Sequence, residues 1–361
     1  MSRLPWRSLF GWTVLGLAIG LGLFFFNYQG SVDSLGPLVV TTPGDVSAPV
    51  FRSELGPSAV NAGGQHDGHY FYLMARAPMH LDASAPYLDF TGYRWGRPVM
   101  AWLAWGLHPT GGGWGLVWAL FIVGVGSLVL GGLGLGALSV TFGGRPWPAV
   151  LFPVFLGSIL SLRISVPDPL AIALAVWAIV LLYRRHLLPA LVVGALAVLT
   201  KETMLLVFAG ILLSRRDRDG ALLVVVPGLA YAAWRTWLRI VLGEFSGTAD
   251  NLKPPFAGLA DAVRWWFAGN EPLAFVALGL AVILGVVALV KRGIGHPLGY
   301  VVALQLAFLV VLNIQVLGPE RNASRAVLPL MAAAVVMLAT PTAGRVVATS
   351  RPAEDPGVLA S

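Results

Sequence analysis

The chain has no cysteine and few charged residues. Of its 361 residues, 57% are hydrophobic and only 11% are charged, whereas a soluble domain carries about 25% charged residues. The absence of cysteine excludes disulfides, thiolate catalysis and zinc or iron–sulfur sites with cysteine ligands. The shortage of charge excludes a disordered chain, a nucleic-acid-binding arm and an ordinary cytosolic enzyme.

The apolar residues fall in blocks of roughly 17–25, the length that crosses a bilayer. The first block, residues 9–26, follows Arg3 and Arg7 and ends in a phenylalanine run without a small-residue cleavage site. We therefore expect an uncleaved first span with its N-terminus inside. Together with it, these blocks predict about eight full spans: 114–140, 147–162, 169–183, 221–242, 273–290, 298–317 and 326–339.

Two further apolar segments, 187–199 and 204–213, are too short to span alone, because 13 residues of helix extend only about 20 Å. Arginines precede the first segment and follow the second, and an excess of arginine marks cytoplasmic loops. Both ends should then be cytoplasmic. The sequence predicts a broken or re-entrant hairpin over residues 187–214, with Lys201 and Glu202 at its tip.

The longest polar stretch, residues 29–97, is predicted to be the first outer loop and to contain short helices. Residues 68–77 form one such candidate, with Asp67 near its start. Residues 97–108 are apolar but too short to span, so they are interfacial or partly inserted. The predicted fold is an all-α, polytopic transmembrane bundle forming one membrane domain over residues 1–340.

The threading places both termini in the cytoplasm, with a disordered cytoplasmic tail over residues 341–361. It also places nearly every acidic residue available for chemistry on the outer side. The spacing Gly16-xxx-Gly20 indicates close helix packing.

The richest polar cluster lies in the first outer loop and consists of His66, Asp67, His69 and Tyr70. A carboxylate between two histidines suits a general base or a cation site, and the neighbouring aromatic rings suit a sugar or an isoprenoid chain. Alternatively, Asp67 caps the following helix in a solvated turn. No clear third ligand accompanies the two histidines, so neither a metal nor another cofactor is predicted.

Other charged residues interrupt the apolar background. Arg94 and Arg97 suit bidentate phosphate binding or interfacial anchoring. Asp168 suits a site or a helix start, and the pair Lys201 and Glu202 suits a site or a structural ion pair. Two arginines four apart share a helix face and could hold a phosphate, or could simply balance the preceding Glu320: Arg321 and Arg325.

In chain order, five motifs accompany these residues: Asp67-Gly-x-Tyr-x-Tyr, Tyr93-Arg-x-Gly-Arg-Pro, Pro167-Asp-Pro-Leu, Leu199-Thr-Lys-Glu-Thr and Arg321-xxx-Arg. Over residues 9–339 this order resembles the GT-C superfamily of polytopic membrane glycosyltransferases, especially bacterial mannosyltransferase-like members. The resemblance implies a polyprenyl-phosphate-linked sugar donor and catalysis on the non-cytoplasmic face of the inner or plasma membrane.

The resemblance further implies that Asp67 is the general base that activates an acceptor hydroxyl on a lipid, a glycan or another molecule, with inversion at the anomeric carbon. The cations Arg94, Arg97, Lys201, Arg321 and Arg325 would neutralise the departing lipid phosphate. Two alternatives remain. A transporter or flippase of lipid-linked or anionic substrates would also use a broken helix with ions at its tip, and a non-catalytic assembly subunit would tolerate substitution of Asp67 and Lys201.

Overall fold

The computed structural model describes residues 4–27, 36–61, 67–243, 251–269 and 271–341. Within these ranges the chain is helical and contains no strand, and two isolated bridges pair Thr41 with Val60 and Leu252 with Leu312. The predicted all-α class is therefore confirmed. The predicted tail lies, from residue 342 onward, outside the described residues.

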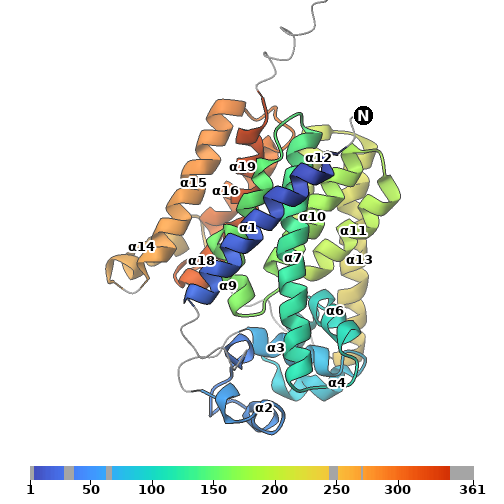
Figure 1. The fold of residues 1–361 in the computed structure, drawn as a ribbon, viewed down its shortest axis with the longest axis vertical. Coiled ribbons are helices and arrows are strands. Elements are labelled where there is room, and N and C mark those ends of the chain that lie inside the picture. The colour runs from blue at the N-terminus through green and yellow to red at the C-terminus, as the bar shows by residue number, and fades with distance from the viewer. Residues whose placement is uncertain (1–3, 28–35, 62–66, 244–250, 270, 342–361) are drawn as a thin grey trace, which may run out of the picture.

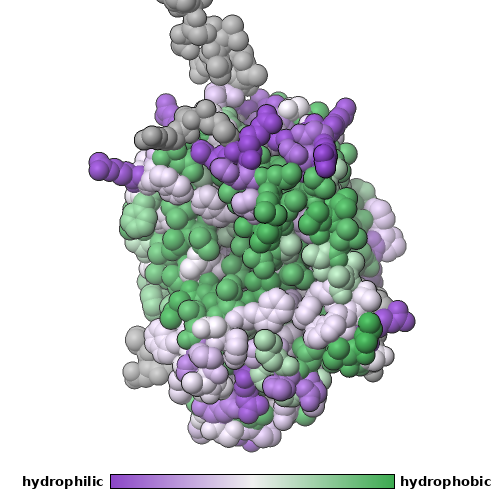
Figure 2. Space-filling view, turned by 90° about the vertical axis from the view of Figure 1, so that its right-hand side faces the viewer, coloured by the Kyte–Doolittle hydropathy of each residue, from purple (hydrophilic) through white to green (hydrophobic). Residues whose placement is uncertain are grey.

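Among the described residues, four helices are long and apolar enough to cross a membrane: α1 (Trp6–Asn27), α7 (Trp114–Thr141), α13 (Arg218–Leu242) and α15 (Pro272–Arg292). The 28 residues of α7 extend for about 42 Å, which exceeds a hydrocarbon core of about 30 Å. On the face that Figure 2 shows, an apolar belt lies between two more polar ends.

A fifth candidate span is the bent pair α18 (Glu320–Ala326) and α19 (Leu328–Ala339), whose axes differ by 43°. Pro329 lies at the start of α19 and accounts for the bend. Its nitrogen carries no hydrogen, so it cannot donate to the carbonyl of Arg325 one turn earlier. The bend turns α18, and with it Arg325, away from the axis of the last apolar helix.

The predicted count of about eight full spans is not confirmed. Residues 147–162 are broken at Phe155, whose ψ of 135° is extended, into three short helices: η4 (Trp147–Val150), α8 (Leu151–Val154) and α9 (Leu156–Arg163). The helices α10 (Asp168–Tyr183) and α16 (Gly299–Val311) have 16 and 13 residues. At about 24 and 20 Å they are shorter than the hydrocarbon core.

Glycine spacing correctly predicted a close approach in α1. Gly16 and Gly20 lie directly against the backbone at Val150 and Pro153, where a Cβ atom would clash. The partner is not a long helix but the broken segment η4–α8. This packing holds α1 beside the segment that leads into α9.

Residues 187–214 form two helices, α11 (Leu187–Thr200) and α12 (Met204–Arg215). Lys201 interrupts them with an extended backbone, φ −159° and ψ 116°. The directions of α11 and α12 follow from their contacts with the two ends of α10. Lys201 at the break contacts Asp168 at the start of α10, whereas the Arg215 guanidinium lies 4.8 Å from the ring centroid of Tyr183 at the end of α10. α11 therefore runs antiparallel to α10, toward its start, and α12 returns toward its end.

The predicted first loop contains α2 (Ala48–Leu55), α3 (Gly68–Arg76), α4 (Leu81–Ser84) and α5 (Thr91–Trp95), followed by α6 (Val99–Leu107). The loop helices gather at the end of the molecule opposite the start of α1 (Figure 1). The predicted helix over 68–77 is confirmed as α3. The nine residues of α6 extend about 14 Å and cannot span a bilayer alone.

A network of hydrogen bonds and one ion pair connects α2 and α3 to the start of α7. The buried Tyr72 hydroxyl donates to Glu54 Oε2 at 2.6 Å and accepts from the Gly113 backbone N–H at 2.6 Å. Arg76 Nε lies 2.6 Å from Glu54 Oε1. Because Tyr72 and Arg76 both belong to α3, this network fixes the helix whose other end begins next to Asp67.

Candidate functional site

Seven charged side chains from six separate segments meet at the loop end of α10. We call them the charged cluster: Asp67, Arg94, Arg97, Asp168, Lys201, Glu202 and Arg325. All seven are residues that the sequence singled out as site candidates. They are separated by as many as 258 positions in the chain, so it is the fold that brings them together.

Asp67 lies immediately before α3 and is the most exposed member of the charged cluster. Its Oδ1 is 3.3 Å from Arg94 Nη1, its Oδ2 is 3.4 Å from Arg325 Nη2, and its side chain is 37% exposed. Its side chain makes no capping hydrogen bond with α3. These long ion pairs leave the carboxylate accessible and free of a strong local partner.

The protonation state of Asp67 is set by its two arginines. Burial raises the pKa of this carboxyl, but the Arg325 and Arg94 guanidinium groups outweigh burial, and the pKa lies below its ordinary value. Asp67 is therefore an anion at neutral pH. It can accept a proton or hold a developing positive charge.

Asp168 is the first residue of α10 and is nearly enclosed, with 7% of its side chain exposed. It accepts a short hydrogen bond from Lys201 Nζ, and its Oδ2 lies 3.5 Å from Arg325 Nη1. Its position at a helix N-terminus is also favourable for a negative charge. Arg325 thus bridges the two aspartates and links α18 to α3 and α10.

Arg97 and Glu202 form the tightest two-point contact in the charged cluster. Arg97 Nε and Nη2 donate to the two Glu202 oxygens at 2.9 and 2.5 Å. The Arg97 guanidinium also lies 4.4 Å from the ring centroid of Tyr93. This pair joins the segment between α5 and α6 to the break between α11 and α12. It therefore holds these two parts of the chain together.

Arg94 has a second carboxylate partner that the sequence did not reveal. Its guanidinium donates to both oxygens of Asp89, at 2.7 and 3.1 Å, and lies 3.9 Å from the ring centroid of Tyr70. The available signal was an acidic residue five positions before Arg94, on the same short loop. With Asp89 included, four cations face four carboxylates, so their charges balance.

α13 supports the arginine-bearing segment from one side. Trp234 Nε1 donates to the Trp95 carbonyl at 2.7 Å, and Arg235 Nη1 donates to the Gly92 carbonyl at 2.5 Å. Arg235 lies in the last two turns of α13. Its contact fixes α5, which carries Arg94.

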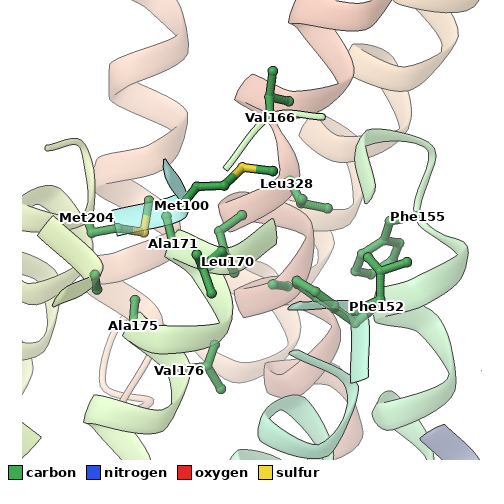
Figure 3. Packing of buried hydrophobic residues seen from close by; sticks show 14 of the residues in the cluster. Met100, Phe152, Phe155, Val166, Leu170, Ala171, Ala175, Val176, Met204 and Leu328 are labelled. Atoms are coloured by element: carbon green, nitrogen blue, oxygen red, sulfur yellow. The ribbon is translucent and has the colours of Figure 1, made fainter. Parts of the chain in front are cut away.

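Buried apolar side chains that follow the members of the charged cluster in the chain pack in the interior (Figure 3). Met100, Leu170, Met204 and Leu328 are at most 4% exposed, and each follows a member of the charged cluster by two or three residues. They come from α6, α10, α12 and α19. Apolar side chains of this kind exclude water from one side of the charged cluster, which strengthens the electrostatic interactions between its members.

Two predicted site residues, His69 and Arg321, are not members of the charged cluster, and a third, His66, is outside the described residues. His69 is fully buried, with its ring centroid 3.7 Å from that of Tyr70 and 6.3 Å from that of Phe51, on the inner side of α3. Arg321 is exposed on α18, and its carbonyl accepts from Arg325 Nε at 2.8 Å.

No metal-ligand grouping of three or more His, Asp or Glu side chains is found in the part of the chain that the structure describes. Comparisons with protein-family models, curated proteins and solved structures gave no match to this chain.

Proposed function

We propose that this protein is an integral membrane glycosyltransferase of the GT-C type that uses a polyprenyl-phosphate-linked sugar. The observation that carries the proposal is the convergence of Asp67, Asp168, Lys201, Glu202 and three arginines on one charged cluster. These residues belong to the motifs through which the sequence resembles that superfamily. A charged cluster beside buried apolar side chains suits a substrate with a polar head and an apolar tail.

In the proposed reaction, the acceptor hydroxyl oxygen attacks the anomeric carbon of the donor sugar. The bond from that carbon to the phosphate oxygen breaks, and the hydroxyl proton passes to Asp67. The leaving polyprenyl phosphate retains the electron pair, and its charge is stabilised by cations already in place. The configuration at the anomeric carbon is inverted.

The order of ion pairs supports this division of roles. Asp67, Arg325, Asp168 and Lys201 follow one another in a chain of contacts, with Asp67 and Lys201 at opposite ends. An in-line displacement needs the incoming hydroxyl and the leaving phosphate on opposite sides of the sugar carbon. Asp67 therefore serves the acceptor, and Lys201 with Arg97 serves the phosphate.

The proposed orientation puts the charged cluster on the non-cytoplasmic side, with both termini inside. Arg184, Arg185 and Arg215 lie at the end of α10 away from the charged cluster, as the contact between Arg215 and Tyr183 supports. Arginine-rich ends of spans are typically cytoplasmic. A transporter would place such charges near the midplane, whereas these lie at one end of α10, which favours the enzyme.

The test is transfer of radiolabelled sugar from polyprenyl-phosphate donors to a lipid extract by the purified protein in proteoliposomes. We expect wild-type transfer and at least a hundredfold lower rate for Asp67→Asn, in line with loss of a general base. Asp82→Asn, an exposed aspartate of α4 in the same loop, is the matched control and should keep the wild-type rate. Normal turnover by Asp67→Asn, or movement of the donor across the membrane without transfer, would contradict the proposal.

A further inference from the structure

A groove of about 520 Å³ runs along the surface between α12 and α13. Every residue that lines it is apolar: Leu205, Leu206, Ala209, Val224, Val225, Gly228 and Leu229. It belongs to the apolar belt and not to the charged cluster. An apolar groove in this position takes an apolar chain, because a polar ligand would lose its hydrogen bonds to water there.

The groove is open on its outer side. Val225 and Leu229 are 51% and 65% exposed, and α13 has little of its apolar stretch covered by other helices. Gly228 leaves the space between the helices empty. A Cβ atom built there would meet only Leu205 Cδ2, at 3.7 Å, which is an ordinary contact distance. A small side chain therefore fits at residue 228, whereas a large one would fill the groove.

One end of the groove lies about one helical turn from the charged cluster along α12. Leu205 follows Glu202 by three residues, which is about one helical turn, and Lys201 directly precedes Glu202. On the other wall, Trp234 and Arg235 contact the backbone of α5, one to two turns beyond Leu229. A ligand with an anionic head and an apolar tail would thus find cations at one end and an apolar channel beyond them.

We propose that this groove binds the isoprenoid chain of a polyprenyl phosphate, and that Gly228 is the residue that keeps it open. The inference rests on the proposed function, because it takes the donor to be lipid-linked. Lys201 and Arg97 bind the phosphate, and the first isoprene units lie between α12 and α13. A single channel suits a single chain, whereas a diacyl phospholipid carries two.

The expected effect is moderate, because a chain entering the groove exchanges one apolar environment for another and gains mainly packing contacts. We expect Gly228→Phe to lower labelling by a sugar-free, diazirine-bearing polyprenyl phosphate by about five- to tenfold. Gly228→Ala should label as the wild type. Gly279→Phe places the same side chain on α15 at a position with nothing within 4 Å and should also label normally.

The label should map to peptides of α12 and α13, and excess unlabelled polyprenyl phosphate, but not phosphatidic acid, should compete with it. Equal labelling of Gly228→Phe and wild type, or equal competition by phosphatidic acid, would overturn the groove proposal even if the protein transfers sugar. Labelling of the groove without transfer from any donor would overturn the proposed function alone. Thermal unfolding in detergent should be the same for the phenylalanine and alanine variants, which separates groove filling from misfolding.

Discussion

Lys201 donates a short hydrogen bond to Asp168, 33 positions earlier in the chain, at the point where two apolar helices break. The pair is only partly open to solvent, with side-chain exposures of 21% and 7%. Without Lys201, the buried Asp168 would keep only its longer contact with Arg325, at 3.5 Å. Removing one partner of a buried pair typically costs more than the pair itself contributes.

Lys201→Met should therefore destabilise the protein by on the order of 3 kcal/mol. Thermal unfolding of the purified protein measures this change. The double variant Lys201→Met with Asp168→Asn should recover most of the stability, because it leaves no unpaired charge, yet it should stay inactive in sugar transfer. Equal stability of the single and double variants would show that the ion pair does not hold the helix break.

The pH dependence of transfer should report the effect of Arg325 on Asp67. The pKa of Asp67 lies below its ordinary value, so this carboxylate stays ionised and the rate should not fall between pH 8 and about 5 on its account. Arg325→Gln removes the charge that most opposes burial, while Asp168 continues to raise the pKa, so we expect the pKa of Asp67 to rise. The acid limb of kcat/KM should then move to higher pH.

Arg325→Lys retains the charge and should leave the acid limb where it is in the wild type. If the acid limb of kcat/KM moves equally in Arg325→Lys and Arg325→Gln, then the shape of the side chain, and not its charge, determines the pKa of the base. A limb that does not move in Arg325→Gln would exclude Asp67 as the titrating base.

Tyr72 should matter for stability more than its exposed neighbour Arg76. Tyr72→Phe removes one hydrogen bond to Glu54 and leaves the Gly113 N–H without its partner, which costs roughly 1–3 kcal/mol for a buried group. The side chain of Arg76 is 37% exposed, so Arg76→Ala should cost less than about 1 kcal/mol. A larger loss of thermal stability in Arg76→Ala than in Tyr72→Phe would contradict the main role of Tyr72 in this network.

His296, in the loop between α15 and α16, should make stability depend on pH. Its Nδ1 accepts from the Leu298 N–H at 3.1 Å and its Nε2 contacts Thr340 Oγ1 at 2.9 Å, so the ring is held neutral. Burial, together with Arg292, lowers its pKa from 6.5 to about 4. The unfolded chain then binds more protons between these values, so stability should fall as the pH drops from about 6.5 to 4.

His296→Gln should flatten that part of the stability curve. Unfolding in detergent at pH 7.5, 6 and 4.5 measures the slope for both proteins. A wild-type slope that the glutamine variant retains in full would assign the pH dependence to other groups.

The apolar pattern located most helices but predicted only some of their breaks. Residues 147–162 are largely apolar in the sequence, yet the extended Phe155 divides them where η4 and α8 pack against Gly16 and Gly20 of α1. The lengths of the flanking segments, together with the arginines at their ends, did predict the break at Lys201. Hydropathy does not encode the packing that accompanies a break such as that at Phe155.

The site residues were easier to find than their partners. Scarcity of charge marked Asp168, Lys201 and Glu202, because each interrupts an apolar background, whereas the neighbouring histidines marked Asp67 in its polar loop. Their pairing was not readable: Glu202 binds Arg97 across 105 positions and not its neighbour Lys201. Asp89 was missed, since an acidic residue in a polar loop is ordinary, and only the fold directs it at Arg94.

The bend at Pro329 also has a consequence for how the protein is made. It places Arg325, which the ribosome adds after every other member of the charged cluster, between Asp67 and Asp168. Until that residue enters the membrane, both aspartates lack their common partner. A chain that ends before α18 would therefore lack the one side chain of the charged cluster that contacts both Asp67 and Asp168.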